Sequence, residues 1–129
     1  MKYGPKKDAN HNELLAEIIK HCPVYDLSKH GGGLPDGLAW VDGAWRLFDV
    51  KNPKTGYGRR GLNPTQKKWL GQCDGGPVYL IYSVEEAGRF ARGQFDGIKF
   101  LDGKSARESV DEALALVQQG RPSTGNGQA

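Results

Sequence analysis

Two acids and a lysine stand at a spacing that could do chemistry. Asp36 precedes Asp49 by thirteen residues, and Lys51 follows two residues after Asp49. The segment between the acids, 38–48, is typical of a β-hairpin, because Asp42-Gly43 is a turn signal between two apolar runs. A hairpin brings the start of its first strand beside the end of its second, so it would bring both carboxylates and the ammonium together. Metal-assisted hydrolysis of a phosphodiester needs such a set.

The two acids would suit a hard divalent cation. Mg²⁺ prefers carboxylate and carbonyl oxygens with water, and without metal two close carboxylates would raise one of their pKa values. Asp49 and Lys51 are two apart on a strand and should point to one face, with Phe48 and Val50 pointing to the other. Lys51 would orient or deprotonate a metal-bound water, or stabilise charge on the phosphoryl oxygens. From the motif alone, an exposed, half-solvated strand edge is an equally good interpretation.

The positive charge of the chain is concentrated directly after these acids. The net charge is +3, and residues 51–68 contain six Lys or Arg and no acid. Such clustering beside the acids is typical of a surface that follows phosphates, although a solvated loop has the same composition. Arginine pairs bidentately with phosphate, and an aromatic ring can contact a base. We therefore predict DNA contacts at Lys54, Tyr57, Arg59, Arg60, Lys67 and Lys68.

The remaining pattern predicts alternating helices and strands. Helices are expected from His11 to His21, from Asn63-Pro64 and from Ser83, the first capped by Asp8 or Asn10. Strands are expected near 24–27, 37–42, 45–51 and 78–82, and a Gly-rich loop at 52–62. Residues 95–102 would add a strand or loop, and a C-terminal helix would run from Ser109 to Gln119. The order αβββαβα plus a C-terminal helix predicts a mixed sheet flanked by helices on both faces.

Length and composition indicate one folded domain. A chain of 129 residues with 37% hydrophobic residues can build a single core. We expect this domain over residues 1–120, with a disordered tail at 121–129. Cys22 and Cys73 have no CxxC spacing and are expected to be reduced thiols. The sequence has neither a run of about 18 apolar residues nor a signal peptide, so we expect a cytoplasmic protein.

The motifs, taken in order, resemble the PD-(D/E)xK nuclease superfamily, and more closely its small phage and bacterial VRR-NUC and Holliday-junction-resolvase-like members. The matching segments are 8–13, 31–36, 47–51, 62–69 and 76–87. The resemblance implies a restriction-endonuclease-like, three-layer α/β/α fold in a bacterial or phage-infected cell. It further implies that Asp36, Asp49 and the carbonyl of Val50 bind the metal. Lys51 would then be the catalytic lysine, with Glu13 and Gln66 completing the site.

We therefore expect a Mg²⁺-dependent deoxyribonuclease in which Mn²⁺ can substitute, with branched or nicked DNA as one substrate class. The alternative is a nuclease-fold protein that binds DNA or a partner without cleavage. A homodimer through the helix at 110–119 is a further alternative. Replacing Lys51 by Ala, or Asp49 by Asn, is expected to abolish cleavage and largely spare folding.

Overall fold

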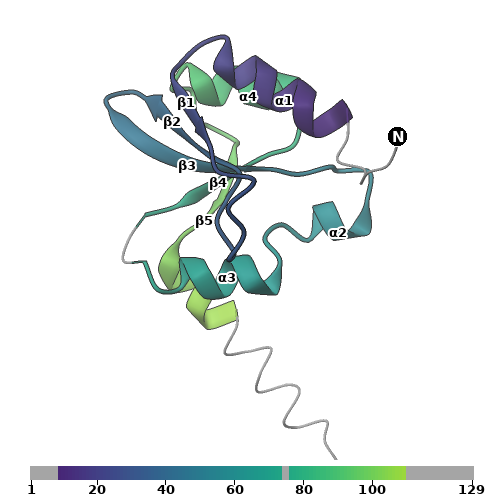
Figure 1. Ribbon diagram of the computed structural model, residues 1–129, viewed down its shortest axis with the longest axis vertical. Helices are drawn as coiled ribbons and strands as arrows, with labels where there is room; N and C mark the ends of the chain where they lie inside the picture. Colours follow the sequence, from purple (N-terminus) through teal and green to yellow (C-terminus); the bar gives the residue numbers. More distant parts are fainter. Residues whose placement is uncertain (1–8, 74–75, 110–129) are drawn as a thin grey trace, which may run out of the picture.

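The computed structural model describes residues 9–73 and 76–109, and Figure 1 shows how its elements are arranged. Within these ranges the helices are α1 (Ala9–Ile19), α2 (Gly56–Arg59), α3 (Pro64–Leu70) and α4 (Val84–Ala91). The strands are β1 (Val24–Asp26), β2 (Gly37–Val41), β3 (Ala44–Val50), β4 (Val78–Ile81) and β5 (Lys99–Leu101). They form one mixed sheet in the order β1-β2-β3-β4-β5. The predicted mixed α/β class is confirmed.

The β2–β3 hairpin forms where the Asp42-Gly43 signal predicts it. Asp42 and Gly43 have φ values of 53° and 79°, and a two-residue hairpin turn of type I′ needs positive φ at both positions. The antiparallel register starts beside this turn and ends where Gly37 pairs with Phe48. Asp36, the residue before β2, is thereby brought level with Asp49 near the end of β3.

The central strand β3 has different partners on its two sides. Strand β2 runs antiparallel to it, and β4 runs parallel. A parallel neighbour requires a crossover connection, which here contains α2 and α3. The carboxyl ends of β3 and β4 therefore lie together. The N–H of Lys51 extends their ladder by donating to the carbonyl of Ile81 at 2.9 Å.

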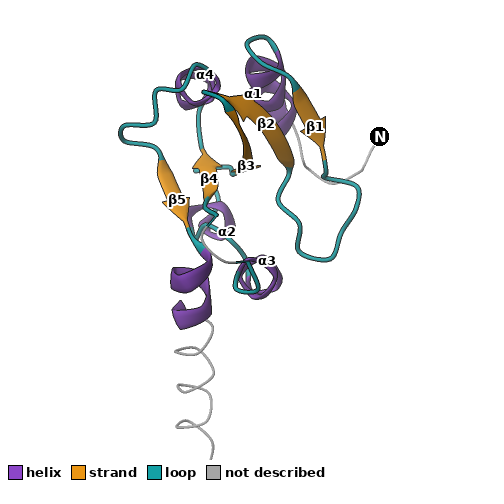
Figure 2. Ribbon diagram, turned by 90° about the vertical axis from the view of Figure 1, so that its left-hand side faces the viewer, coloured by secondary structure: helices purple, strands orange, loops and turns teal. Residues whose placement is uncertain are grey.

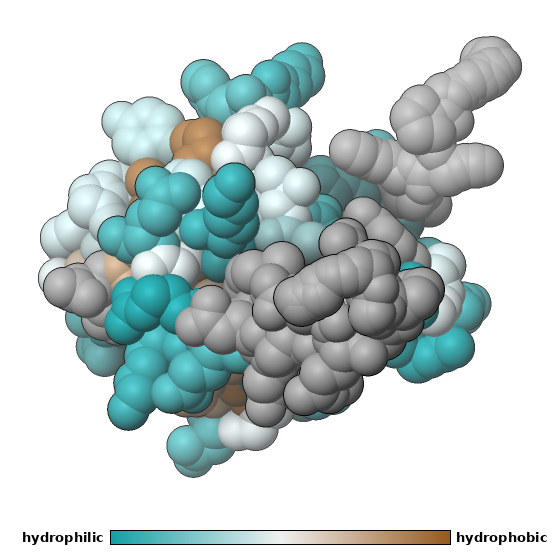
Figure 3. All heavy atoms as spheres, turned by 90° about the horizontal axis from the view of Figure 1, so that it is seen from below, coloured by the Kyte–Doolittle hydropathy of each residue, from teal (hydrophilic) through white to brown (hydrophobic). Residues whose placement is uncertain are grey.

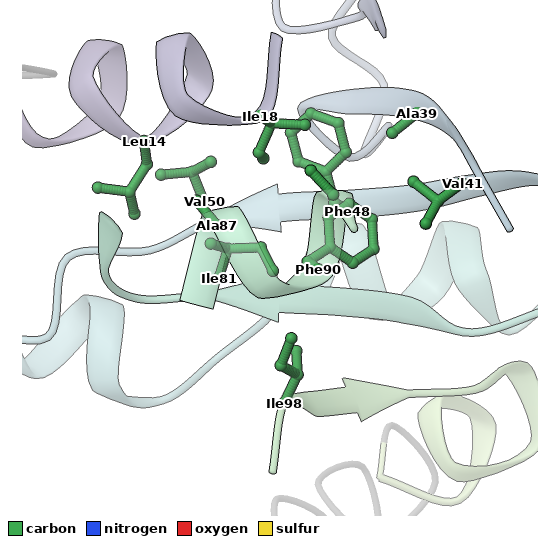
Figure 4. Packing of buried hydrophobic residues seen from close by; sticks show 11 residues of the cluster. Leu14, Ile18, Ala39, Val41, Phe48, Val50, Ile81, Ala87, Phe90 and Ile98 are labelled. Carbon is green, nitrogen blue, oxygen red and sulfur yellow. The ribbon is translucent and has the colours of Figure 1, made fainter. Parts of the chain in front are cut away.

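Two apolar clusters pack against the two faces of the sheet. Helices α1 and α4 lie side by side over one face, and α3 lies on the other side (Figures 1 and 2). The first face carries the larger cluster, drawn in Figure 4: Leu14, Ile18, Ala39, Val41, Phe48, Val50, Ile81, Ala87, Phe90, Ala91 and Ile98. The second face carries Leu62, Leu70, Val78, Leu80 and Ala106. Because side chains alternate along β3, Phe48 and Val50 enter the first cluster and leave Asp49 and Lys51 on the α3 side, as predicted.

Several boundaries differ from those predicted. Residues 56–59 of the expected loop form α2, and residues 99–101 form the edge strand β5. Asn10 lies inside α1 rather than capping it, and its side chain donates to the carbonyl of Lys51. The C-terminal helix starts before Ser109, since residues 103–109 are already helical. The Asp102 carboxylate accepts the N–H of Ser105 at the start of that segment, at 2.8 Å. Asp8, the predicted helix at 110–119 and the tail at 121–129 lie outside the described residues.

Both cysteines are half-buried, separate thiols. Cys22 packs against the larger apolar cluster and Cys73 against the smaller one, so the two thiols lie on opposite faces of the sheet. This arrangement confirms that they do not form a disulfide with each other. Among the helices that the structure describes, none has the length and apolar character needed to cross a bilayer.

Candidate active site

Asp49 and Lys51 form a buried ion pair at the end of the central strand. The Nζ of Lys51 lies 2.8 Å from Oδ2 of Asp49, and the two side chains are only 9% and 2% exposed. A buried charge is costly unless it is paired and hydrogen-bonded. The alternative interpretation of an exposed strand edge is therefore wrong. Two charged side chains in an apolar strand need another explanation.

Asp36 joins this pair through two hydrogen bonds across the hairpin. Its backbone N–H donates to Oδ1 of Asp49 at 3.0 Å, and its Oδ2 accepts the N–H of Val50 at 2.8 Å. Strand β2 begins at Gly37, so the Asp36 carboxylate takes up the hydrogen-bonding position beside β3 that a longer β2 would fill. These distances confirm the prediction that the hairpin brings Asp36, Asp49 and Lys51 together.

The surroundings of Asp36 favour its protonated form. Burial raises the pKa of this carboxyl, the negative charge of Asp49 raises it further, and the result is a pKa of about 7. The N–H of Val50 and the ammonium of Lys51 lower the pKa of Asp36, but they do not offset the rise. His11 places its Nδ1 3.9 Å from Oδ2 of Asp36. The site can therefore take up or release a proton on Asp36 near neutral pH.

Gln66 connects the acid site to the start of α3. The side-chain Oε1 of Gln66 accepts a hydrogen bond from the backbone N–H of Asn63 at 3.0 Å. The backbone N–H of Gln66 donates to Oδ1 of Asn63 at 2.9 Å, which completes a capping box. The same side chain accepts from Nζ of Lys51 and donates to Oδ1 of Asp49, both at 3.2 Å. One glutamine thus orients both members of the buried ion pair, in the position where support for the lysine was predicted.

The oxygen atoms of the site suit one small divalent cation. In the described ranges no group of three or more His, Cys, Asp or Glu side chains is placed to hold a metal. Mg²⁺, however, commonly binds through one or two carboxylates and keeps several waters. The N–H of Val50 points to Asp36, and the carbonyl of the same extended residue points to the same edge. The oxygen atoms of Asp36, Asp49 and the Val50 carbonyl are of the chemical kind that Mg²⁺ prefers.

Helix α1 brings Asn10 and His11 to the site. The Nδ2 of Asn10 donates to the carbonyl of Lys51 at 3.4 Å, and the Nδ1 of His11 lies near Asp36. Glu13 is exposed and follows Asn10 by three residues, and its role at the acids stays a prediction. Helical spacing was the available signal for the two missed residues, because they stand four and three positions before the buried Leu14.

The basic residues after β3 divide into two groups. Lys54, Arg59, Arg60 and Lys68 are exposed, as a phosphate-binding surface requires. Lys67 instead donates to Oγ of Ser109 at 2.9 Å. That hydrogen bond ties α3 to the helical segment 103–109 and competes with the predicted DNA contact. Tyr57 belongs to α2. Figure 3 shows the side of the molecule that carries α3, where hydrophilic residues predominate among those drawn in colour.

Tyr82 holds the basic loop against the sheet. Its hydroxyl donates to the carbonyl of Gly58 in α2 at 3.1 Å, and its backbone N–H donates to Oε1 of Glu86 at 2.8 Å. Burial raises the pKa of the Tyr82 hydroxyl, and the carboxylates of Glu86 and Asp49 raise it further. The hydroxyl therefore stays protonated and able to donate. The sequence does not indicate this role, because a tyrosine at the end of an apolar strand predicts only packing.

Replacing Tyr82 by Phe is expected to loosen the basic loop without unfolding the protein. The ring and its packing are kept, and one hydrogen bond worth about 1 kcal/mol is lost. The amides of Arg59 and Gly61, which are hydrogen-bonded within the loop, should exchange faster while β3 stays protected, as measured by hydrogen–deuterium exchange. Tyr79→Phe, on the opposite face of β4, is the matched control. Equal loop protection in both variants would refute this role of Tyr82.

Comparisons of this chain with protein-family models, with curated proteins and with solved structures found no match. The assignment of a function therefore depends on the geometry of the site itself. That geometry joins two carboxylates, a buried ammonium and an amide at the carboxyl end of β3.

Proposed function

We propose that this chain is a Mg²⁺-dependent nuclease that hydrolyses phosphodiester bonds in DNA. One observation carries the proposal: Asp36, Asp49 and Lys51 meet at the end of the central strand. A structural ion pair would need only Asp49 and Lys51, and the half-buried Asp36 adds a negative charge that nothing compensates once it ionises. A cation would remove this imbalance, and the exposed basic residues of the following loop would bind the phosphates.

We also propose the finer architecture that the PD-(D/E)xK resemblance implies, a restriction-endonuclease-like α/β/α fold. The arrangement of α1 and α4 over one face of the sheet and α3 on the other supports it. The parallel pairing of β3 and β4 supports it as well, because it puts the acid-bearing strand in the interior of the sheet.

In this proposal Asp36, Asp49 and the Val50 carbonyl would hold the cation. Bound Mg²⁺ supplies Lewis acidity that lowers the pKa of a coordinated water and offsets charge at the scissile phosphate. Asp36 must lose its proton to act as a ligand, and a pKa of about 7 makes this loss inexpensive near neutral pH. Asp49 is held in place by Gln66 and by the N–H of Asp36.

Lys51 has one hydrogen-bond donor left for the reaction. An ammonium carries three N–H groups, and two of them are directed to Asp49 and Gln66. The third can donate to a phosphoryl oxygen, where charge develops as the bond breaks. Charge stabilisation is therefore better supported for Lys51 than deprotonation of the attacking water.

The purified protein is expected to cut DNA with Mg²⁺ or Mn²⁺ and to be inactive in EDTA. The assay compares linear, supercoiled, nicked, flapped and four-way DNA. Asp26→Asn, which changes an exposed carboxylate bonded to Ser28, should cut like the wild type. Asp36→Asn should not cut. If the wild-type protein cut none of these substrates with either metal, the nuclease proposal would be rejected.

A DNA-binding protein that does not cleave is the second candidate. One observation favours it: both carboxylate oxygens of Asp49 already interact within the chain, with the Asp36 N–H, Gln66 and Lys51. A carboxylate satisfied in this way can stabilise the fold without a cation. Titration calorimetry separates the two candidates. A heat of Mg²⁺ binding that disappears in Asp36→Asn supports the nuclease, whereas salt-sensitive DNA binding without that heat supports the binding protein.

A further inference from the structure

Three exposed aromatic side chains form one cluster on the sheet. Tyr25 is 62% exposed, Trp40 41% and Trp45 46%. The ring centroid of Trp45 lies 5.3 Å from that of Tyr25 and 5.3 Å from that of Trp40. The other exposed large hydrophobic side chains in the described ranges, Ile19, Val84 and Phe100, stand in separate elements. Exposed aromatic surface is thus gathered at one place on β1, β2 and β3.

This aromatic cluster lies on the same face of the sheet as the acid pair, Asp36 and Asp49. Trp40 stands four residues after Asp36 along β2, and Trp45 stands four residues before Asp49 along β3. Side chains alternate along a strand, so residues four apart point to the same side. Tyr25 joins them from β1 through its contact with Trp45. The distance from Asp36 to Trp40 is about 13 Å along the strand, the length of about four stacked nucleotides.

Packing within the hairpin explains only part of the cluster. Trp40 and Trp45 are directly opposite each other beside the turn, and such cross-strand aromatic pairs stabilise a hairpin. Tyr25 lies outside the hairpin and leaves most of its ring in water. Helices α1 and α4 cover the other face of the sheet (Figure 2). Grouped aromatic surface that remains in water is typical of a binding site.

The charges beside the cluster favour a ligand with phosphates. Lys29 and His30 are exposed in the turn that follows β1. This turn stays beside the acid site, because the N–H of Leu27 donates to the carbonyl of Asp36 at 2.7 Å. Asp26 points to the opposite face from its strand neighbour Tyr25, and its carboxylate accepts two hydrogen bonds from Ser28. The positive side chain of Lys29 therefore lies between Tyr25 and Asp36 along the chain.

We propose that Tyr25, Trp40 and Trp45 bind the unpaired bases of a single-stranded DNA segment next to the phosphodiester bond at the acid pair. This inference rests on the proposed nuclease function and names its substrate class: DNA with a flap, gap or overhang beside the cut, in preference to continuous duplex. Aromatic rings bind successive bases by stacking, and basic side chains follow the backbone. Bases inside a duplex have no free face to offer such rings.

The test measures binding without cleavage. A fluorescent oligothymidylate of about twelve nucleotides is titrated with the full chain in EDTA and followed by anisotropy. Tyr25→Ala is expected to weaken binding by about 5- to 150-fold, the range for loss of one stacked base. Tyr25→Phe should bind with wild-type affinity, because the ring is kept. Tyr25→Leu should bind as weakly as Tyr25→Ala, because leucine keeps apolar surface but has no ring.

Phe100→Ala is the matched control. Phe100 is 57% exposed on β5, at the opposite edge of the sheet, and its loss should leave affinity unchanged. The tryptophan fluorescence of the wild type should be quenched by the oligonucleotide. If the wild type did not bind the oligonucleotide, or if Tyr25→Ala and Tyr25→Leu bound it as the wild type does, the stacking role would be wrong. The cluster would then serve the hairpin or a protein partner.

This test separates failure of the inference from failure of the proposed nuclease function. If binding depends on Tyr25 but the protein cuts no DNA, the base-binding role of the cluster is supported and the nuclease proposal is rejected. If the protein cuts flapped DNA with metal and Tyr25→Ala does not change this cleavage, the nuclease proposal is supported and the cluster is rejected as a substrate contact.

Discussion

Asp36→Asn is expected to raise the stability of the metal-free protein at alkaline pH and to abolish Mg²⁺-dependent cleavage. The pKa of Asp36 is about 7 in the folded protein, against an ordinary value of 3.8. Between these pH values the folded protein holds a proton that the unfolded chain has lost. Stability therefore falls as the pH rises from 3.8 to about 7 and levels off above that value. A difference of about three pKa units corresponds to a penalty on the order of 4 kcal/mol once Asp36 is ionised.

Asparagine imitates the protonated acid and avoids this penalty. Its oxygen can accept the N–H of Val50, and its N–H can donate to the carboxylate of Asp49. The free energy of unfolding in EDTA should therefore increase by about 2–4 kcal/mol near pH 8.5 and change little near pH 3, where Asp36 is protonated in both the folded and the unfolded protein. Urea denaturation at the two pH values measures both quantities. Cleavage is lost because a neutral amide replaces an anionic ligand.

Asp26→Asn is the control for this pH dependence. Hydrogen bonds from Ser28 lower the pKa of Asp26, so its ionised form favours folding and the variant should gain no stability at alkaline pH. An Asp36→Asn protein that is less stable than the wild type near pH 8.5 would contradict the raised pKa. So would a gain of the same size at both pH values.

Lys51→Met is expected to lose both cleavage and stability. The rate should fall by about 10²- to 10³-fold, the usual cost of removing one donor that stabilises charge in the transition state. The free energy of unfolding should fall by about 3–5 kcal/mol, because the carboxylate of Asp49 is left buried without its counter-ion. The sequence led us to expect that replacing Lys51 or Asp49 would largely spare folding. The burial of the pair changes that expectation.

A double-mutant cycle tests the cause of this loss. Asp49→Asn removes the charge that Lys51 compensates, so the double variant with Lys51→Met should be less destabilised than the sum of the single variants by about 2 kcal/mol. Exposed Lys54 supplies the control, and Lys54→Met should leave the free energy of unfolding within about 0.5 kcal/mol. Simple additivity of Asp49→Asn and Lys51→Met would mean that the ion pair is not the source of the effect.

The parts of the fold that depend on local chemistry were predictable. The Asp42-Gly43 turn sets the hairpin register, and that register brings Asp36 to Asp49. Asn63 and Gln66 cap α3 through hydrogen bonds three residues apart, and Ser83 caps α4 by the same chemistry. Each of these features uses atoms that are close in the chain, so residue types and spacing were sufficient.

The contacts that were not predicted join distant segments. The packing of α1 on the sheet brings Asn10 and His11 to the site, where only Glu13 was expected from this helix. Lys67, which was expected at a DNA surface, donates to Ser109, which lies 42 residues further along the chain. Neither outcome is encoded in the neighbouring residues. Both depend on how a helix rotates and where it docks.

Residue types and their spacing were sufficient to show which groups could act, namely Asp36, Asp49 and Lys51 at hairpin spacing with Gln66 at a helix start. The charges on these groups depend on the folded chain. Helix α3 packs over the face of β3 that carries Asp49 and Lys51 and buries these two side chains together. This packing contributes to a low-dielectric site in which the pKa of Asp36 rises to about 7. Burial depends on what covers a side chain, and residues that cover one another here are far apart in the chain. For that reason spacing predicted the constellation, and only the folded chain set its electrostatics.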